Sequence, residues 1–150
     1  MKIGIGADHH GYLLKEILRQ ELEQAGHEVV DYGCHSEKAV DYPAVAFNVS
    51  QSILGEEVER GILICGTGIG MAIAANKIPG IRAAQVTDPY SAERAQLSND
   101  AQIITLGSKI TGDEVAKKLV AEYLSHRFKA SPSLRKISQI TAKETELRQN

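Results

Sequence analysis

Apolar residues fall into two alternating patterns, short continuous runs and longer stretches with helical spacing. The short runs predict strands at residues 2–6, 27–33, 60–65, 79–86 (after a turn) and 101–107. The helical spacing predicts helices at residues 11–25, 42–54, 69–77, 89–97 and 112–124. The run Arg60–Cys65 does not alternate with polar residues, which is typical of a strand buried on both faces.

This order of elements is five consecutive strand–helix units. It predicts an α/β fold with a five-stranded parallel sheet and helices on both faces, a three-layer α/β/α domain. The pattern changes after Phe128. Residues 129–150 are polar, with Ile137 and Ile140 as the main apolar positions, and predict a loop and a C-terminal helix that packs on a partner chain. We therefore expect a domain at residues 1–128 and a tail at 129–150.

Composition narrows the class of protein. The chain has 150 residues, 43% hydrophobic and 24% charged, with a net charge of −2, which suits one globular domain. Basic clusters and stacking aromatic residues are scarce, which argues against nucleic-acid binding. We find no membrane-length apolar stretch and no signal-peptide pattern. Two cysteines do not suggest a disulfide framework, so we expect a cytoplasmic protein.

The parallel sheet predicts where a ligand binds, because ligands of such sheets lie at the carboxyl ends of the strands. The segments expected there are Ala7–Gly11, Gly33–Tyr42, Cys65–Gly70, Thr87–Tyr90 and Gly107–Lys109.

A glycine-rich turn follows the third predicted strand. Gly66, Gly68 and Gly70 allow a tight turn whose N–H groups point into one concave space at a helix N-terminus, which attracts anions. The dinucleotide fingerprint is not met, because its third glycine position is Met71, and no Gly-Lys-Ser/Thr follows for a P-loop.

Cys65 immediately precedes this turn. A thiol at a helix N-terminus loses its proton more easily, and the adjoining N–H groups can hold an oxyanion that forms on a substrate. This arrangement suits proton abstraction next to a carbonyl. A buried, apolar Cys65 is the competing interpretation, and position alone does not decide between them.

Other polar residues offer further candidates. Asp8 and His9 are suited to sugar hydroxyls or a phosphate, although Asp8 can equally cap the following helix. The hydroxyl of Tyr42 is suited to the site or to packing, and Ser98–Asp100 needs no function as a turn. No spacing of ligands resembles a metal site. The remaining histidines are expected to be structural or exposed: His10, His27, His35 and His126.

Several motifs together resemble the ribose-5-phosphate isomerase B family, which includes the galactose-6-phosphate isomerase subunits. They are ADHHG, VDYP, GILICGTGIGMAIAANKIPGIRAA, DPYSAERA and SNDAQIITLGSKITGDEVAKKLV, in the right order and spacing over residues 1–128. The resemblance implies a Rossmann-like domain, a homodimer or tetramer with sites at the subunit interface, and cofactor-free aldose–ketose isomerisation of phosphosugars.

The resemblance also implies roles for individual residues. Cys65 is the base that moves a proton between neighbouring carbons through an enediol, with Thr67 assisting and Asp8 also at the catalytic centre. The residues that it implies contact the substrate or form the anion hole are His9, Tyr42, Gly66, Gly68, Gly70, Met71, Ser98, Asn99, Arg135 and Lys136.

Two positions depart from the family pattern. Ser98 stands where ribose-specific members have a histidine thought to open the furanose ring. In the tail, Pro132 replaces one arginine of the phosphate site and Lys136 another. Arg135 and Lys136 are left to supply the charge, and Lys136 lacks the bidentate fork of an arginine.

These departures leave the substrate open. Ribose 5-phosphate is the default of the family, whereas a tetrose 4-phosphate cannot close a furanose and does not need the histidine. Three further interpretations compete with these two: a galactose-6-phosphate isomerase subunit, a non-catalytic phosphosugar-binding module and a flavodoxin-like nucleotide-binding protein.

Overall fold

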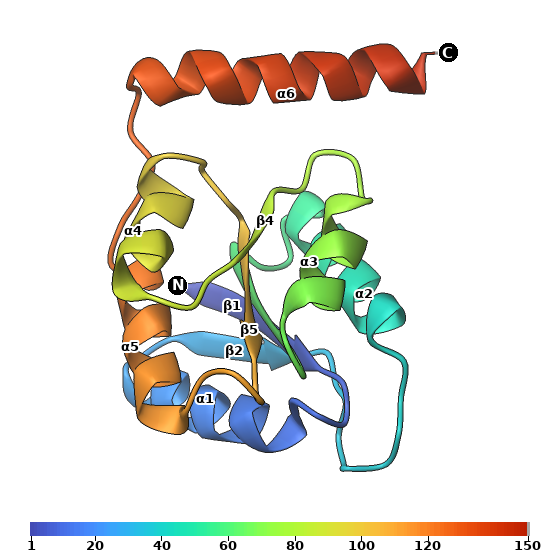
Figure 1. Ribbon diagram of the computed structural model, residues 1–150, viewed down its shortest axis with the longest axis vertical. Helices are drawn as coiled ribbons and strands as arrows, with labels where there is room; N and C mark the ends of the chain where they lie inside the picture. The colour runs from blue at the N-terminus through green and yellow to red at the C-terminus, as the bar shows by residue number, and fades with distance from the viewer. Residues whose placement is uncertain (150) are drawn as a thin grey trace.

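A parallel sheet of five strands forms the centre of the computed structural model, which describes residues 1–149. The strands are β1 (Lys2–Ala7), β2 (Glu28–Asp31), β3 (Arg60–Cys65), β4 (Ala83–Gln85) and β5 (Ile103–Gly107). Their order is β2-β1-β3-β5-β4, with every pair parallel (Figure 1). The predicted five-stranded α/β fold is therefore confirmed.

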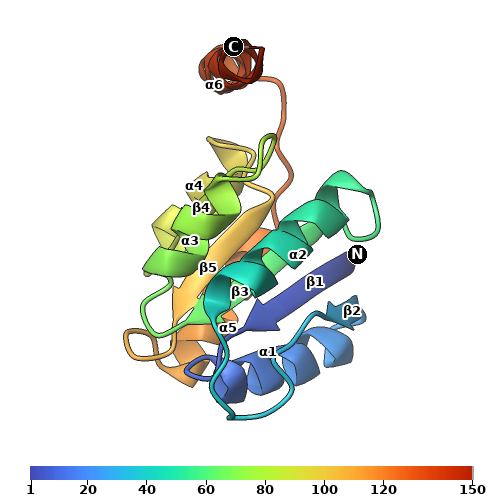
Figure 2. The same cartoon turned by 90° about the vertical axis from the view of Figure 1, so that its right-hand side faces the viewer.

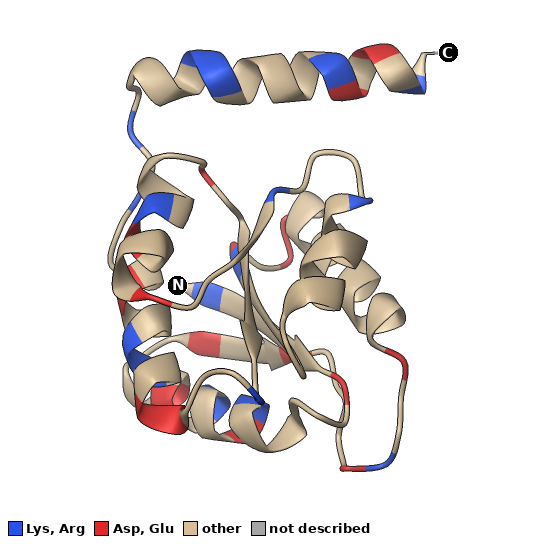
Figure 3. Cartoon of the chain, in the orientation of Figure 1, with Lys and Arg blue, Asp and Glu red and all other residues tan. Residues whose placement is uncertain are grey.

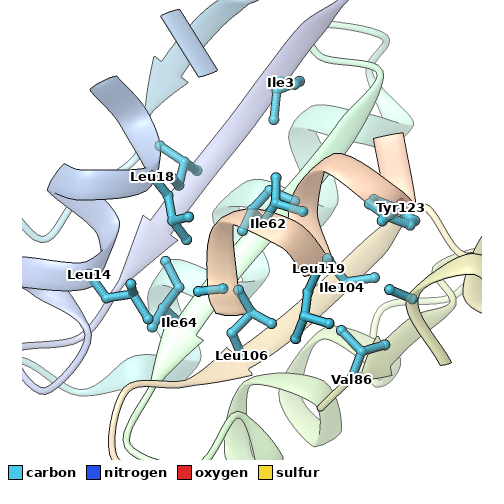
Figure 4. Close-up of a cluster of buried hydrophobic side chains, with 14 of the residues drawn as sticks. Ile3, Leu14, Leu18, Ile62, Ile64, Val86, Ile104, Leu106, Leu119 and Tyr123 are labelled. Carbon is cyan, nitrogen blue, oxygen red and sulfur yellow. The ribbon is translucent and has the colours of Figure 1, made fainter. Parts of the chain in front are cut away.

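Helices cover both faces of the sheet (Figures 1 and 2). They are α1 (Tyr12–Gln24), α2 (Tyr42–Leu54), α3 (Ile69–Asn76), α4 (Pro89–Leu97) and α5 (Asp113–Leu124). On one face α1, α4 and α5 enclose a core that includes Ile62, Ile104 and Tyr123 (Figure 4). On the other face α2 and α3 bury Leu63, Ile103 and the Cys65 side chain.

The two edge strands are shorter than the apolar pattern predicts. After Asp31 the chain turns away from the β2 direction, since Gly33 has a φ of +96° and its N–H donates to Asp31 Oδ1 at 2.9 Å. Before β4, the N–H of Arg82 donates to Gln102 Oε1 at 2.8 Å. Backbone bonds to β1 nevertheless continue beyond Asp31, since the N–H of Tyr32 donates to the Ile5 carbonyl at 2.9 Å, so these side-chain hydrogen bonds add to the strand pairing rather than replace it.

The predicted C-terminal helix, α6 (Pro132–Arg148), extends along one end of the molecule (Figures 1 and 2). Ile137 is its buried residue, and Glu144 accepts a hydrogen bond from the N–H of Gly80 at 2.8 Å. Ile140 and Leu147 are exposed by 54% and 66%. Most of this helix thus lies in solvent in a single chain.

Charged residues of both signs are spread over the helices and loops (Figure 3). Within residues 1–149, no helix has the length and apolar character needed to cross a membrane.

Candidate active site

Cys65 ends β3 at the carboxyl edge of the sheet. Its side chain is only 4% exposed and lies in the core cluster of α2 and α3. Its sulfur nevertheless accepts a hydrogen bond from the N–H of Gly68, with Sγ and N 3.1 Å apart. The cysteine therefore combines burial with a polar contact to the glycine-rich turn.

The turn takes its shape from Gly68, which caps the N-terminus of α3 with a φ of +81°. L side chains rarely adopt this conformation, and a Cβ here would lie 3.0 Å from the carbonyl carbon of Leu106. A larger residue at this position would strain the backbone and push the turn away from β5.

Four N–H groups around the turn are available to a ligand. Within residues 1–149, none of the N–H groups of Gly66, Thr67, Gly70 and Met71 donates to a protein acceptor. Gly70 and Met71 belong to the first turn of α3, where N–H groups have no intrahelical partner. N–H groups without protein acceptors at a helix N-terminus are suited to bind an anion next to Cys65. The Met71 side chain is fully buried, so only its backbone can contact a ligand.

Tyr42 begins α2 and packs against the glycine turn. A Cβ on Gly70 would collide with its ring and lie 2.7 Å from the hydroxyl oxygen. Tyr42 is 37% exposed, so its ring lies at the surface beside the turn rather than in the core. Gly70 is needed here for this close approach.

The loop after β1 supplies two more of the expected residues. Asp8 is 4% exposed, and its Oδ1 accepts the N–H groups of His10 at 3.0 Å and Gly11 at 3.1 Å. Asp8 therefore does cap the turn before α1. Among residues 1–149 no donor reaches its Oδ2, which leaves this oxygen for a substrate hydroxyl. His9 Nδ1 lies 3.2 Å from both the N and the O of Val40, which holds the ring beside the Tyr42 loop.

Lys109 adds a cation that the sequence analysis did not single out. Its N–H donates to the carbonyl of Gly66 at 3.0 Å, and its side chain passes over that glycine. Lys109 belongs to the Gly107–Lys109 segment at the end of β5, which the sequence analysis placed at the ligand-binding edge. This position is the signal by which Lys109 could have been identified. Lys109 thus adds a positive charge beside the glycine-rich turn.

Four expected substrate residues lie elsewhere. Ser98 and Asn99 precede β5, and therefore lie at the amino edge of the parallel sheet, roughly 15 Å from its carboxyl edge. Arg135 and Lys136 are on α6, which lies at that same amino end, where Ile140 and Glu144 share a pocket with Asn99. One chain therefore does not bring these four residues to Cys65.

Ser98 has a defined partner at this edge. Its Oγ accepts a hydrogen bond from Arg94 Nε at 2.7 Å, within the last turn of α4. Asn99 is exposed, and its carbonyl accepts from Arg82 Nε at 3.0 Å.

A separate cluster has the side chains to hold a metal ion. Ligand atoms lie within 4.8 Å of one another on Glu93 of α4, Glu122 of α5 and His126, which follows α5. His126 Nε2 is 2.9 Å from Glu122 Oε1, and Arg94 Nη1 lies 3.7 Å from Glu93 Oε2. These contacts are those of a surface ion-pair network, and the cluster is not part of the Cys65 site.

Comparisons with known proteins identify related chains. Residues 3–140 match the family model described as Ribose/Galactose Isomerase. The chain is 47% identical over 137 residues to Ribose-5-P isomerase B of Listeria innocua, covering 91% of this chain and 93% of that one. It is 44% identical over 142 residues to D-erythrulose-4-phosphate isomerase of Pectobacterium atrosepticum, covering 93% of each.

A solved structure supports the same relationship. The structure of ribose-5-phosphate isomerase B from Clostridium thermocellum superposes with a TM-score of 0.96 at 41% identity. The match covers 98% of this chain and 99% of that chain.

Proposed function

The chain belongs to the ribose/galactose isomerase family, and we propose that it is a phosphosugar aldose–ketose isomerase that interconverts ribose 5-phosphate and ribulose 5-phosphate. The observation that carries this proposal is the Cys65 sulfur beside a concave turn with four available N–H groups. A base next to preorganised donors is what proton transfer beside a carbonyl requires.

The reaction follows from this placement. The Cys65 thiolate removes the proton from carbon 2 of the open-chain aldose, and that electron pair forms the double bond between carbons 1 and 2. Oxygen 1 becomes negatively charged, is held by the available N–H groups and takes up a proton to give the enediol. Loss of the proton from oxygen 2 and return of the thiol proton to carbon 1 then produce the ketose.

Neighbouring side chains have matching tasks. The Thr67 hydroxyl accepts the N–H of Ile69 at 3.2 Å, so its own proton is free to pass between oxygens 1 and 2. Asp8 Oδ2 and Tyr42 face sugar hydroxyls, while His9 and Lys109 offer donors to the anionic end of the substrate.

A second copy of the chain completes the site in this proposal. The support is the separation of Ser98, Asn99, Arg135 and Lys136 from Cys65 within one chain. A twofold dimer that sets the amino edge of one sheet against the carboxyl edge of the other makes two equivalent shared sites. The exposed apolar residues of α6 then gain a partner surface.

D-Erythrulose 4-phosphate is the second candidate substrate, and Ser98 is the observation that favours it. The Ser98 hydroxyl accepts from Arg94, and a serine is a poor substitute for a ring-opening histidine. A four-carbon sugar phosphorylated on oxygen 4 has no furanose to open. In either case the free thiols of Cys34 and Cys65 suit a reducing cytoplasm, where we place the reaction.

The test is the rate of isomerisation of ribose 5-phosphate and D-erythrulose 4-phosphate by the purified protein. A higher kcat/KM for ribose 5-phosphate is expected, and the reverse order would transfer the assignment to the second candidate. Absence of turnover with both would contradict the proposal.

A further inference from the structure

We propose that Thr105 and Gln85 are positioning residues that hold the Gly68 N–H against the Cys65 sulfur. Their importance for turnover rests on the proposed function, in which Cys65 is the base. Neither residue was singled out by the sequence analysis, and each is joined to the glycine-rich turn by a side-chain hydrogen bond.

Thr105 acts from inside the sheet. It is fully buried in β5, a strand whose other side chains are Ile103, Ile104 and Leu106. Its Oγ1 donates a hydrogen bond to the carbonyl of Gly68 at 2.7 Å. Burying a hydroxyl in an apolar strand is costly unless it is hydrogen-bonded, so this contact is the reason a polar residue is accommodated here.

Gln85 acts from the end of β4. Its Nε2 donates to the carbonyl of Thr67 at 2.8 Å. That carbonyl belongs to the same peptide group as the Gly68 N–H, which donates to Cys65 Sγ. The amide of Gln85, the peptide group and the sulfur thus form one chain of hydrogen bonds, in which each bond polarises the next.

The turn needs both anchors because Gly68 is conformationally free. A glycine with a φ of +81° has no Cβ to restrict its rotation, and a hydrogen bond weakens steeply when its donor angle falls. The carbonyls on either side of the Gly68 α-carbon are each fixed by a side chain from a neighbouring strand. The Gly68 carbonyl also accepts the N–H of Ala72 at 3.1 Å, so β4 and β5 set the direction of the Gly68 N–H together with the first turn of α3.

The test is the pH profile of Cys65 alkylation by iodoacetamide, followed on the Cys65 peptide by mass spectrometry in a Cys34→Ala background. Thr105→Val keeps the shape and removes the hydroxyl, whereas Thr105→Ser keeps the hydroxyl. We expect the midpoint of the profile to move up by roughly 0.5–1 pH unit in Thr105→Val, the worth of one hydrogen bond to the thiolate. Thr105→Ser should stay near wild type.

Gln85→Met provides the second variant, since Gln85 is exposed and its replacement leaves the core intact. It should move the midpoint in the same direction. Loosened packing alone would raise the alkylation rate at every pH without moving the midpoint. Ser50→Ala is the control, because the buried Ser50 hydroxyl on α2 has no hydrogen-bond partner within residues 1–149.

An unchanged midpoint in both Thr105→Val and Gln85→Met would overturn the proposal. Alkylation requires no sugar, so its outcome is independent of the isomerase assignment. A shifted midpoint without turnover of any phosphosugar would retain the positioning role and reject the proposed function. In an active enzyme, Thr105→Val should lower kcat roughly three- to tenfold and leave KM unchanged.

Discussion

The ring of Tyr42 occupies the space that a side chain on Gly70 would need. This contact joins the first residue of α2 to the first turn of α3 directly beside Cys65. The glycine-rich turn therefore serves two purposes, since it exposes N–H groups and also admits an aromatic wall for the site.

Gly70→Ala should displace Tyr42 and impair the site. We expect a loss of stability of about 1–3 kcal/mol from overpacking, with a several-fold rise in KM. Gly112→Ala is the matched control, because a Cβ there meets nothing within 4 Å and Gly112 lies outside the candidate site. Melting curves and steady-state kinetics of both variants make the comparison. Equal KM values for the two would show that Tyr42 does not form part of the site.

Lys109→Met should weaken binding of the anionic substrate, because it removes the cation beside the available N–H groups. We expect KM to rise roughly tenfold, in keeping with the loss of one charge-assisted hydrogen bond. Lys109→Arg keeps the charge and should retain most of the affinity. Steady-state kinetics at low and high salt measure the KM of each variant. A KM unaffected by Lys109→Met would show that this residue is not part of the site.

Mixing two variants tests the shared site. Cys65→Ala and Asn99→Ala should each be nearly inactive alone. If each site takes Cys65 from one chain and Asn99 from the other, unfolding and refolding them together should restore about a quarter of wild-type activity in a symmetric dimer. Each variant refolded alone is the control. A mixture that stays inactive would place both residues in the same chain's site.

Acid should weaken the contact between Glu59 and Arg127. The Arg127 guanidinium holds the pKa of the Glu59 carboxyl below its ordinary value of 4.5. The folded state then binds its proton less readily than the unfolded state, so the stabilisation is present above pH 4.5 and is lost as pH falls through the lower folded-state pKa.

Because the side chains of Arg127 and Glu59 are 66% and 43% exposed, this effect should stay below about 1 kcal/mol. Urea unfolding at neutral pH and at about pH 3.5 measures it. Glu59→Gln should lose part of the acid sensitivity, and Glu57→Gln, which removes a carboxylate from the same loop, is the control. Identical acid sensitivity of wild type and Glu59→Gln would contradict the role of this pair.

The sequence predicted the order of elements and the sheet, because buried strands and amphipathic helices differ in the period of their apolar residues. It also indicated that Cys65 lies beside a concave turn, since glycine spacing and the end of an apolar strand are both local features.

Contacts between distant segments could not be read in the same way. The Tyr42 ring on Gly70 depends on how α2 and α3 pack, and the Thr105 hydroxyl on Gly68 joins residues 37 positions apart. The position of Asn99 at the opposite edge from Cys65 follows from strand direction. Spacing along the chain does not show that Asn99 and Cys65 lie at opposite ends of one subunit.

The central claim is that Cys65 is the base that moves the proton between carbons 1 and 2. The most direct test uses ribose 5-phosphate as substrate in deuterated water. It measures the deuterium that wild type and Cys65→Ala each incorporate into the product. Wild type should form ketose carrying deuterium at carbon 1, while Cys65→Ala, with an unchanged melting temperature, should form neither ketose nor labelled sugar. Turnover by Cys65→Ala at the wild-type rate would contradict the account and assign the proton transfer to another group.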